Sequence, residues 1–136
     1  MGLMVRRSIA VQAIVTEKLK EELKAELEEA IETTQHRVEQ MEFQSRRFLA
    51  DLQRTDLTQA MNARRQIEAE KRRQDAIIQD LRKQVEEAEK LELGSEFPRG
   101  TLEGTVELSA GDDLVSKLSA SRIVVKDGIV VEVSEA

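Results

Sequence analysis

Apolar residues recur in steps of three and four through the long middle of the chain, from Thr16 to Leu91, which contains no Gly or Pro. This spacing predicts amphipathic helix, with one stripe of side chains buried against a partner helix. The first stripe comprises Leu19, Leu23, Leu27, Ala30, Thr34, Val38, Met41, Ser45, Phe48 and Leu52, and the second comprises Leu57, Ala60, Arg64, Ile67, Lys71, Gln74, Ile78, Leu81, Val85 and Ala88. Because three positions of the second stripe are polar, we expect the outer half of this stretch to pack more loosely.

The helical stretch is better explained by two helices than by one. Asp56, followed three residues later by Gln59, resembles a helix-capping pair and predicts a restart after a turn near residues 53–57. An unbroken helix would extend about 110 Å and would separate the strands at its two ends. An antiparallel hairpin of about 50–55 Å brings those strands together instead. A straight helix in a domain-swapped dimer is the alternative.

Strand-like segments flank the helical stretch. Residues 5–15 alternate in character, and residues 102–108 alternate apolar residues with polar ones. Gly104 falls on the apolar face of the second segment, where it predicts a bend or a close approach of another chain segment. Residues 111–118 predict one or two capped helical turns, and residues 122–133 predict a β-hairpin.

The register of this final hairpin depends on its turn. A two-residue turn would place Glu132 opposite Ile123 and mix polar and apolar residues on both faces. A three-residue turn at 126–128 instead places Arg122 opposite Glu132, a favourable charge pair, and leaves one face apolar. We therefore predict a type I turn with Gly128 in the left-handed region as a bulge.

Together these patterns predict an α+β fold with a long antiparallel helical hairpin (a coiled-coil arm) inserted in a small antiparallel β-barrel-like domain. Residues 1–15 and 94–136 would form the β domain, and residues 16–93 would form the hairpin. The 136-residue length fits one domain with such an appendage.

Charge is distributed unevenly along the helical stretch. The chain carries a net charge of −6, but residues 43–75 carry +3, whereas residues 17–42 carry −5 and residues 76–92 carry −2. The eight basic residues of the middle segment are candidate contacts for a partner or a nucleic acid: Arg46, Arg47, Arg54, Arg64, Arg65, Lys71, Arg72 and Arg73. In a hairpin, the pairs at 46–47 and 64–65 would form one basic collar able to meet phosphates. The alternative is a solvated face partly neutralised by neighbouring acids.

Residues that carry catalytic or metal chemistry are few. His36 lies off the apolar stripe and is expected to be solvated, and Asp112 with Asp113 fits a turn and a helix cap better than a calcium site. Without cysteine, the chain has no disulfide and no cysteine-ligated metal site. We expect no catalytic residue, metal, cofactor or small-molecule substrate.

No apolar run reaches the roughly 18–20 residues of a membrane helix, so we expect a cytoplasmic protein without membrane contact.

Short motifs outside the helices are similar to those of the YlqD family of small bacterial proteins. They are Ala13-Ile14-Val15-Thr16, Leu91-Glu92-Leu93-Gly94, Glu103-Gly104, Gly111-Asp112 and Ile123-Val124-Val125-Lys126-Asp127-Gly128. The resemblance implies a helical hairpin inserted in a small β domain, with no assigned activity and no catalytic residues. In some bacteria, genes of this family lie near those of ribosome and RNA maturation factors.

We therefore expect a non-catalytic interaction or scaffold protein of unknown biochemical function, which uses its coiled-coil arm to bind a protein partner or a second copy of itself. The alternative is an RNA- or ribosome-associated module that contacts phosphates through the basic outer half of the arm. The two hypotheses differ in the salt dependence that each predicts.

Overall fold

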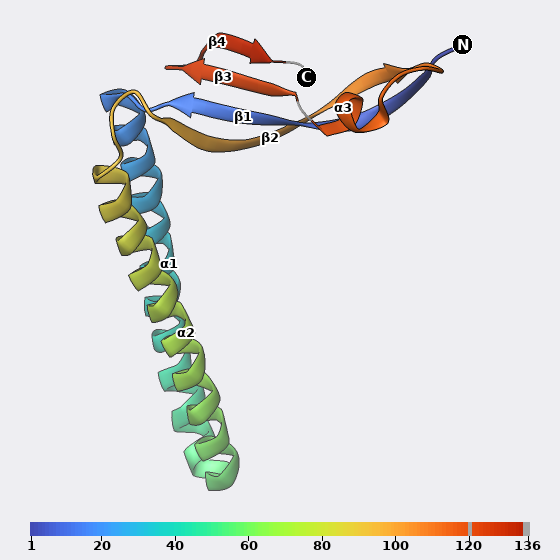
Figure 1. The fold of residues 1–136 in the computed structure, drawn as a ribbon. Coiled ribbons are helices and arrows are strands. Elements are labelled where there is room, and N and C mark those ends of the chain that lie inside the picture. Colours follow the sequence, from blue (N-terminus) through green and yellow to red (C-terminus); the bar gives the residue numbers. More distant parts are fainter. Residues whose placement is uncertain (120, 135–136) are drawn as a thin grey trace. The chain divides into compact units, whose positions relative to one another are not determined.

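The structure, a computed structural model, describes residues 1–119 and 121–134 (Figure 1). The chain divides into two compact units. Met1–Lys20 and Leu91–Ala136 form the first, here called the sheet unit, and Glu21–Lys90 form the second, here called the arm. Long helices and a four-stranded sheet are both present, so the predicted α+β class is confirmed.

Two long helices run antiparallel and side by side, as Figure 1 shows: α1 (Glu17–Thr55) and α2 (Leu57–Glu89). A single residue, Asp56, separates them. Its backbone is extended, and its Oδ1 accepts a hydrogen bond from the Gln59 amide at 3.1 Å. Its own amide donates to the Leu52 carbonyl at 2.8 Å and so completes the last turn of α1. The predicted capping role of Asp56 is confirmed, because a side-chain acceptor replaces the missing helical partner of an N-terminal amide.

At its other end α1 begins within the sheet unit. The Thr16 hydroxyl accepts a hydrogen bond from the Leu19 amide at 3.1 Å and donates one to Asp127 Oδ1 at 2.6 Å. The preceding residue, Val15, is almost fully buried, and its amide donates to the Ser95 carbonyl at 2.8 Å. The sequence thus uses one Thr to cap the helix and to hold the turn of the final hairpin.

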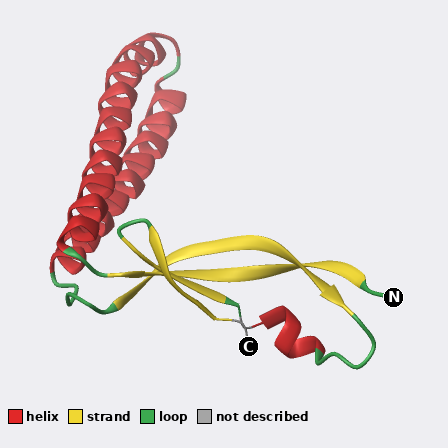
Figure 2. Ribbon diagram, turned by 90° about the horizontal axis from the view of Figure 1, so that it is seen from above, coloured by secondary structure: helices red, strands yellow, loops and turns green. Residues whose placement is uncertain are grey.

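The sheet unit holds four strands and one short helix, which Figure 2 shows in yellow and red. Their bounds are β1 (Leu3–Ile14), β2 (Glu96–Leu108), α3 (Leu114–Ser119), β3 (Arg122–Lys126) and β4 (Ile129–Ser134). The strand order is β2-β1-β3-β4. A hydrogen bond from Arg7 Nη1 to the Lys117 carbonyl at 3.2 Å ties α3 to β1.

The prediction of a purely antiparallel, barrel-like domain is wrong. β1 pairs antiparallel with β2 but parallel with β3, over residues 10–13 of β1. The chain reverses direction after β2, with α3 in the connection, so β3 runs antiparallel to β2 and therefore parallel to β1. The four strands form an open sheet with β2 and β4 as its edges, since no pairing among the described residues joins the two.

The predicted turn of the final hairpin is also wrong. Lys126 pairs with Ile129, so only Asp127 and Gly128 lie in the turn. Both have positive φ, 50° and 83°, which defines a type I′ turn. Asp tolerates the left-handed region better than most residues, and the Thr16 hydroxyl holds this one in place.

A bulge inside β4 replaces the bulge predicted in the turn. Val131 is the extra residue, so Glu132 lies opposite Val124 rather than opposite Arg122. Arg122 still reaches that carboxylate diagonally, with Nη2 3.9 Å from Oε2, and makes a shorter ion pair of 2.7 Å with Glu96. Val124, opposite Glu132 in this register, is one of the two most buried residues.

Gly104 occupies a close approach between β1 and β2. A Cβ at this position would lie 2.9 Å from Cδ1 of Ile9, so the end of the Ile9 side chain would have to shift to make room for it. The predicted close approach at Gly104 is therefore confirmed. Val106, two residues on, is buried on the same strand and continues the core of the sheet unit.

Candidate partner-binding surface

The apolar seam between α1 and α2 closes well in the inner part of the arm and less well toward the turn. Leu23, Ile78 and Ala88 are buried in the inner part. Near the turn, Phe48 is 55% exposed and Leu57 is 64% exposed, although both were predicted on the stripes. The outer part of the seam therefore leaves apolar surface in contact with solvent.

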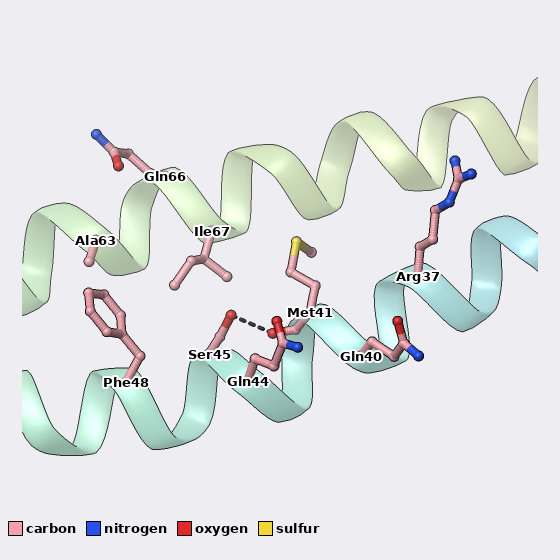
Figure 3. Close-up of a pocket in the computed structure, with 9 residues that line it drawn as sticks. All are labelled: Arg37, Gln40, Met41, Gln44, Ser45, Phe48, Ala63, Gln66 and Ile67. Atoms are coloured by element: carbon pink, nitrogen blue, oxygen red, sulfur yellow. Dashed lines mark hydrogen bonds between the residues drawn. The ribbon is translucent and has the colours of Figure 1, made fainter.

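This apolar surface is exposed because the seam is poorly filled at Ser45. Its small side chain lies across from Ile67, as Figure 3 shows, and its hydroxyl donates to the Met41 carbonyl of its own helix. Because Ser45 fills little space, a groove opens on each side of it, and Ser45 and Ile67 line both grooves.

The first groove has an apolar floor and a polar rim. Its volume is about 500 Å³. The lining residues, drawn in Figure 3, are Arg37, Gln40, Met41, Gln44, Ser45, Phe48, Ala63, Gln66 and Ile67. The Phe48 ring lies beside Ala63 at one end of the groove. An apolar floor bordered by amides and one cation is suited to an amphipathic helix.

The second groove is smaller and charged, with a volume of about 350 Å³. Its lining residues are Glu42, Ser45, Arg46, Leu49, Arg64, Ile67, Glu68 and Lys71. Arg64 and Lys71, predicted as polar positions of the second stripe, line this groove between the helices, and both side chains are exposed. Their long aliphatic stems let the charged groups reach solvent beside the seam.

One ion pair crosses the second groove. Lys71 Nζ lies 2.5 Å from Glu42 Oε1 and links the two helices. The hydrogen bond and the charge of Lys71 lower the pKa of the Glu42 carboxyl below its usual 4.5, while the same contacts raise the pKa of Lys71 above its usual 10.5. Both groups are therefore charged at neutral pH.

The structure gathers some of the predicted basic contacts and separates others. Arg46 and Arg64 lie together with Lys71 around the second groove. Arg47 and Arg65 line neither groove, because consecutive helical residues are rotated by about 100° around the axis. The basic residues thus occupy several sides of the arm rather than one groove.

Most of these basic side chains lack an acidic partner. Lys71 pairs with Glu42, and Arg73 pairs with Glu70 at 3.1 Å. The other six are exposed and form no ion pair within the part of the chain that the structure describes: Arg46, Arg47, Arg54, Arg64, Arg65 and Arg72. Their charge is therefore available to a ligand that approaches from solvent.

Sequence reasoning missed the grooves, although a signal was present. It placed Met41, Ser45 and Phe48 on one buried stripe, whereas the structure leaves all three beside a groove. A small Ser between larger apolar seam residues marks a position where two helices cannot fill the space between them.

The remaining candidates keep their structural roles. His36 is solvated, with Nδ1 3.7 Å from Glu39 Oε2. Asp113 caps α3 by accepting from the Val115 amide at 3.1 Å, as predicted for this pair of carboxylates. Among the described residues, no group of three or more His, Cys, Asp or Glu side chains is placed to hold a metal ion. Within residues 1–119 and 121–134, no helix combines the length and apolar character that a membrane crossing requires.

Fold and surface together define a class of protein in which a helical hairpin is inserted between the first and second strands of a small open sheet. The YlqD protein family model matches residues 3–134, and the chain belongs to this family. The uncharacterised protein YlqD of Bacillus subtilis (strain 168) is 31% identical over 127 residues, which cover 93% of this chain and 94% of the relative. A crystal structure of a protein of unknown function from Synechococcus sp. WH 8102 is similar, with a TM-score of 0.85 and 26% identity over 99% of this chain and 96% of that one.

Proposed function

We propose that this YlqD-family protein is a non-catalytic interaction module whose arm binds a protein partner through the outer half of the helical hairpin. The observation that carries the proposal is the first groove, where Phe48, Met41 and Ile67 form apolar surface between two helices. A hairpin of two helices buries its stripes only against each other. A third helix laid in the groove would cover the remaining apolar surface, as in a helical bundle.

Affinity capture from a lysate of the source organism tests this proposal, and two Phe residues provide a matched pair of variants. Phe48 lines the first groove, whereas Phe43 is 77% exposed on α1 and does not line it. We expect Phe48→Ala to lose at least about tenfold of the captured protein partner and Phe43→Ala to retain it, because truncation of a hot-spot residue costs about 2 kcal/mol or more and about 1.4 kcal/mol corresponds to tenfold. Equal capture by both variants, at wild-type level, contradicts the proposal.

A second candidate function is contact with RNA phosphates. The observation that favours it is the set of six basic side chains that form no ion pair with any residue that the structure describes. Contacts of this kind release counterions, so affinity would fall steeply as salt rises. The aromatic residues of the outer half are Phe43 and Phe48, so stacking on bases would contribute little, and recognition would rest on backbone shape.

Nuclease treatment of the lysate separates the two functions. A protein partner that remains bound after nuclease treatment supports protein binding at the first groove. A partner that is lost on nuclease treatment supports RNA contact. Filter binding of a structured RNA then measures the second function directly. The double substitution Arg47→Glu and Arg65→Glu should abolish RNA retention on the filter. Unchanged retention would contradict RNA binding by these side chains.

A further inference from the structure

The arm carries opposite charges on its two halves. The inner segments, residues 21–42 and 76–90, hold twelve acidic and five basic side chains, a net charge of −7. The outer segment, residues 43–75, holds eight basic and five acidic side chains, a net charge of +3. A surface complementary to the basic outer half therefore exists on this same chain.

Neighbouring residues of like charge form two bands along the arm. The basic band consists of Arg46, Arg47, Arg64 and Arg65, and the acidic band consists of Glu28, Glu29 and Glu32 of α1. All seven side chains are exposed, and none forms an ion pair within the described chain. Within the arm, Glu28 contributes to the raised pKa of Lys24 and Arg46 contributes to the lowered pKa of Glu42, so each band is only partly neutralised by its own arm.

The positions of the two bands fit an antiparallel pair of arms. At 1.5 Å per residue, the arm extends about 52 Å from Glu21 to Asp56, the basic band lies about 14 Å from Asp56, and the acidic band lies about 40 Å from it. Two arms side by side in opposite directions with full overlap would therefore bring each basic band to the level of the partner's acidic band. Parallel arms would set like charges against each other.

Apolar surface falls at matching levels. The first groove spans about 12 to 28 Å from Asp56, and the opposite level on an antiparallel second arm lies at about 24 to 40 Å. Ile31, half-buried, and Ile77, 47% exposed, lie in that interval on the inner half of the arm. Aliphatic side chains of the second arm therefore lie at the same level as the first groove.

We infer that the partner of the basic, grooved outer half is the inner half of the arm of a second copy of this chain, in an antiparallel dimer. This inference rests on the proposed function and names its partner. The arrangement is two-fold symmetric, so each contact occurs twice and the assembly closes at two copies. Complementary charge sets the antiparallel direction and the register.

Sedimentation velocity measures the mass of the assembly, for which one chain contributes 15.4 kDa. We expect a dimer at low ionic strength that weakens as salt rises, because the Debye length shrinks from about 30 Å at 0.01 M to about 3 Å at 1 M. A monomer at every concentration and salt would overturn the inference, and so would a dimer that does not respond to salt.

Addition of structured RNA tests the other class of ligand, since binding of RNA by a monomer would also overturn the inference.

Charge reversal gives the sharper test. One variant reverses the basic band (R46E, R47E, R64E, R65E) and the other reverses the acidic band (E28K, E29K, E32K). Each alone would bring like charges together in both contacts, and we expect its dissociation constant to rise about a hundredfold or more. Circular dichroism at 222 nm checks that both stay helical, since Glu, Lys and Arg are all good helix formers.

Mixing the two variants should restore dimerisation. In the mixed pair, the reversed basic band meets the reversed acidic band, and the two unaltered bands meet each other. A heterodimer is therefore expected where neither variant self-associates. Glu103→Lys with Glu107→Lys on β2 changes the net charge but leaves both bands intact, so this control should dimerise as the wild type does.

Unchanged dimers in both band variants, or no heterodimer on mixing, would overturn the inference. Failure of the proposed function is a separate result. A monomeric protein that still captures a partner sensitive to Phe48→Ala would remove the second copy as the partner but would retain the binding role of the groove.

Discussion

Single polar side chains determine where the helices begin. The Thr16 hydroxyl, the Asp56 carboxylate and the Asp113 carboxylate each accept a hydrogen bond from an amide in the first turn of a helix. Such amides have no helical partner, so a side-chain oxygen at the cap replaces water. Asp56 and Asp113 were recognisable from the sequence because Asp favours this position for that reason.

Asp56→Ala removes the cap that separates the two long helices. We expect the free energy of unfolding to fall by about 1 kcal/mol, since the Gln59 amide would lose its acceptor. Urea unfolding followed by circular dichroism at 222 nm measures the change. Asp51→Ala, a nearby exposed carboxylate without a capping contact, is the control and should change stability by less than about 0.5 kcal/mol. Equal effects of the two substitutions would contradict the capping role.

The ion pair between Glu42 and Lys71 makes a prediction about pH. Because the pKa of Glu42 is lowered in the folded chain, its stabilising effect is complete above the usual 4.5 and is lost as pH falls through the lowered value. Because the pKa of Lys71 is raised, its effect is complete below the usual 10.5 and is lost as pH rises through the raised value. The pair therefore persists across neutral pH.

Carbon-detected NMR titration of the Glu42 carboxyl tests this directly. We expect a midpoint below 4.5 in the wild type and a rise toward 4.5 in Lys71→Met, which keeps the side-chain length but removes the charge. An identical midpoint in the two proteins would show that the contact is not formed in solution.

At the scale of elements, two features depend on how neighbours fit together. The grooves form because Ser45 is too small to fill the space that faces Ile67, and this depends on both helices at once. The strand order places β4 at an edge, where Ile129, Val130 and Val133 are all more than half exposed. The other edge, β2, carries Pro98 and several charges, which discourage pairing with another chain.

Ser45→Leu should fill the space between the helices. We expect the free energy of unfolding to rise by about 0.5–2 kcal/mol, because Leu is a better helix former and adds apolar contact in the seam. The same substitution should weaken capture of the partner, since the side chain would occupy the floor of the grooves. Thermal unfolding and affinity capture together check both effects, and a more stable protein with wild-type capture would contradict the binding role of the groove.

Val133→Lys should reduce aggregation through the unprotected edge of the sheet. Val133 is 71% exposed, so we expect stability to change by no more than about 0.5 kcal/mol. Light scattering during heating should show slower aggregation, because a charge on an edge strand opposes pairing between chains. Thr101→Lys on β2, an edge already rich in charge, is the matched control and should leave the aggregation rate unchanged. Equal rates for Val133→Lys and wild type would contradict this view of β4.

At the scale of the whole molecule, periodicity and capping residues were sufficient to predict two long helices flanked by strands. The parallel pairing of β1 with β3 was not predictable, because it depends on where the connection after β2 places the chain. The two-residue turn at Asp127 was rejected because it would place Glu132 opposite Ile123. A bulge at Val131, which the sequence did not reveal, shifts Glu132 opposite Val124 and makes that turn possible. The basic candidates were identified by charge alone, whereas their division between the second groove and other sides of the arm depends on helix rotation.

The two long helices of one chain fold back on each other, and the grooves and both bands depend on that hairpin. Lys24 and Glu89 lie on opposite helices, and their side chains form an ion pair with a nitrogen-to-oxygen distance of 3.0 Å. The chain has no cysteine, so in the double variant Lys24→Cys and Glu89→Cys the two introduced cysteines are the only sites for spin labels.

Pulsed electron paramagnetic resonance of the doubly labelled chain, diluted with unlabelled protein, measures the distance between the two labels within one chain. We predict a single short distance of about 20 Å, since packed helix axes lie about 8–10 Å apart and the label linkers add the rest. A distance near 100 Å, as in a straight helix with a rise of about 1.5 Å per residue, would contradict the hairpin and support a domain-swapped dimer.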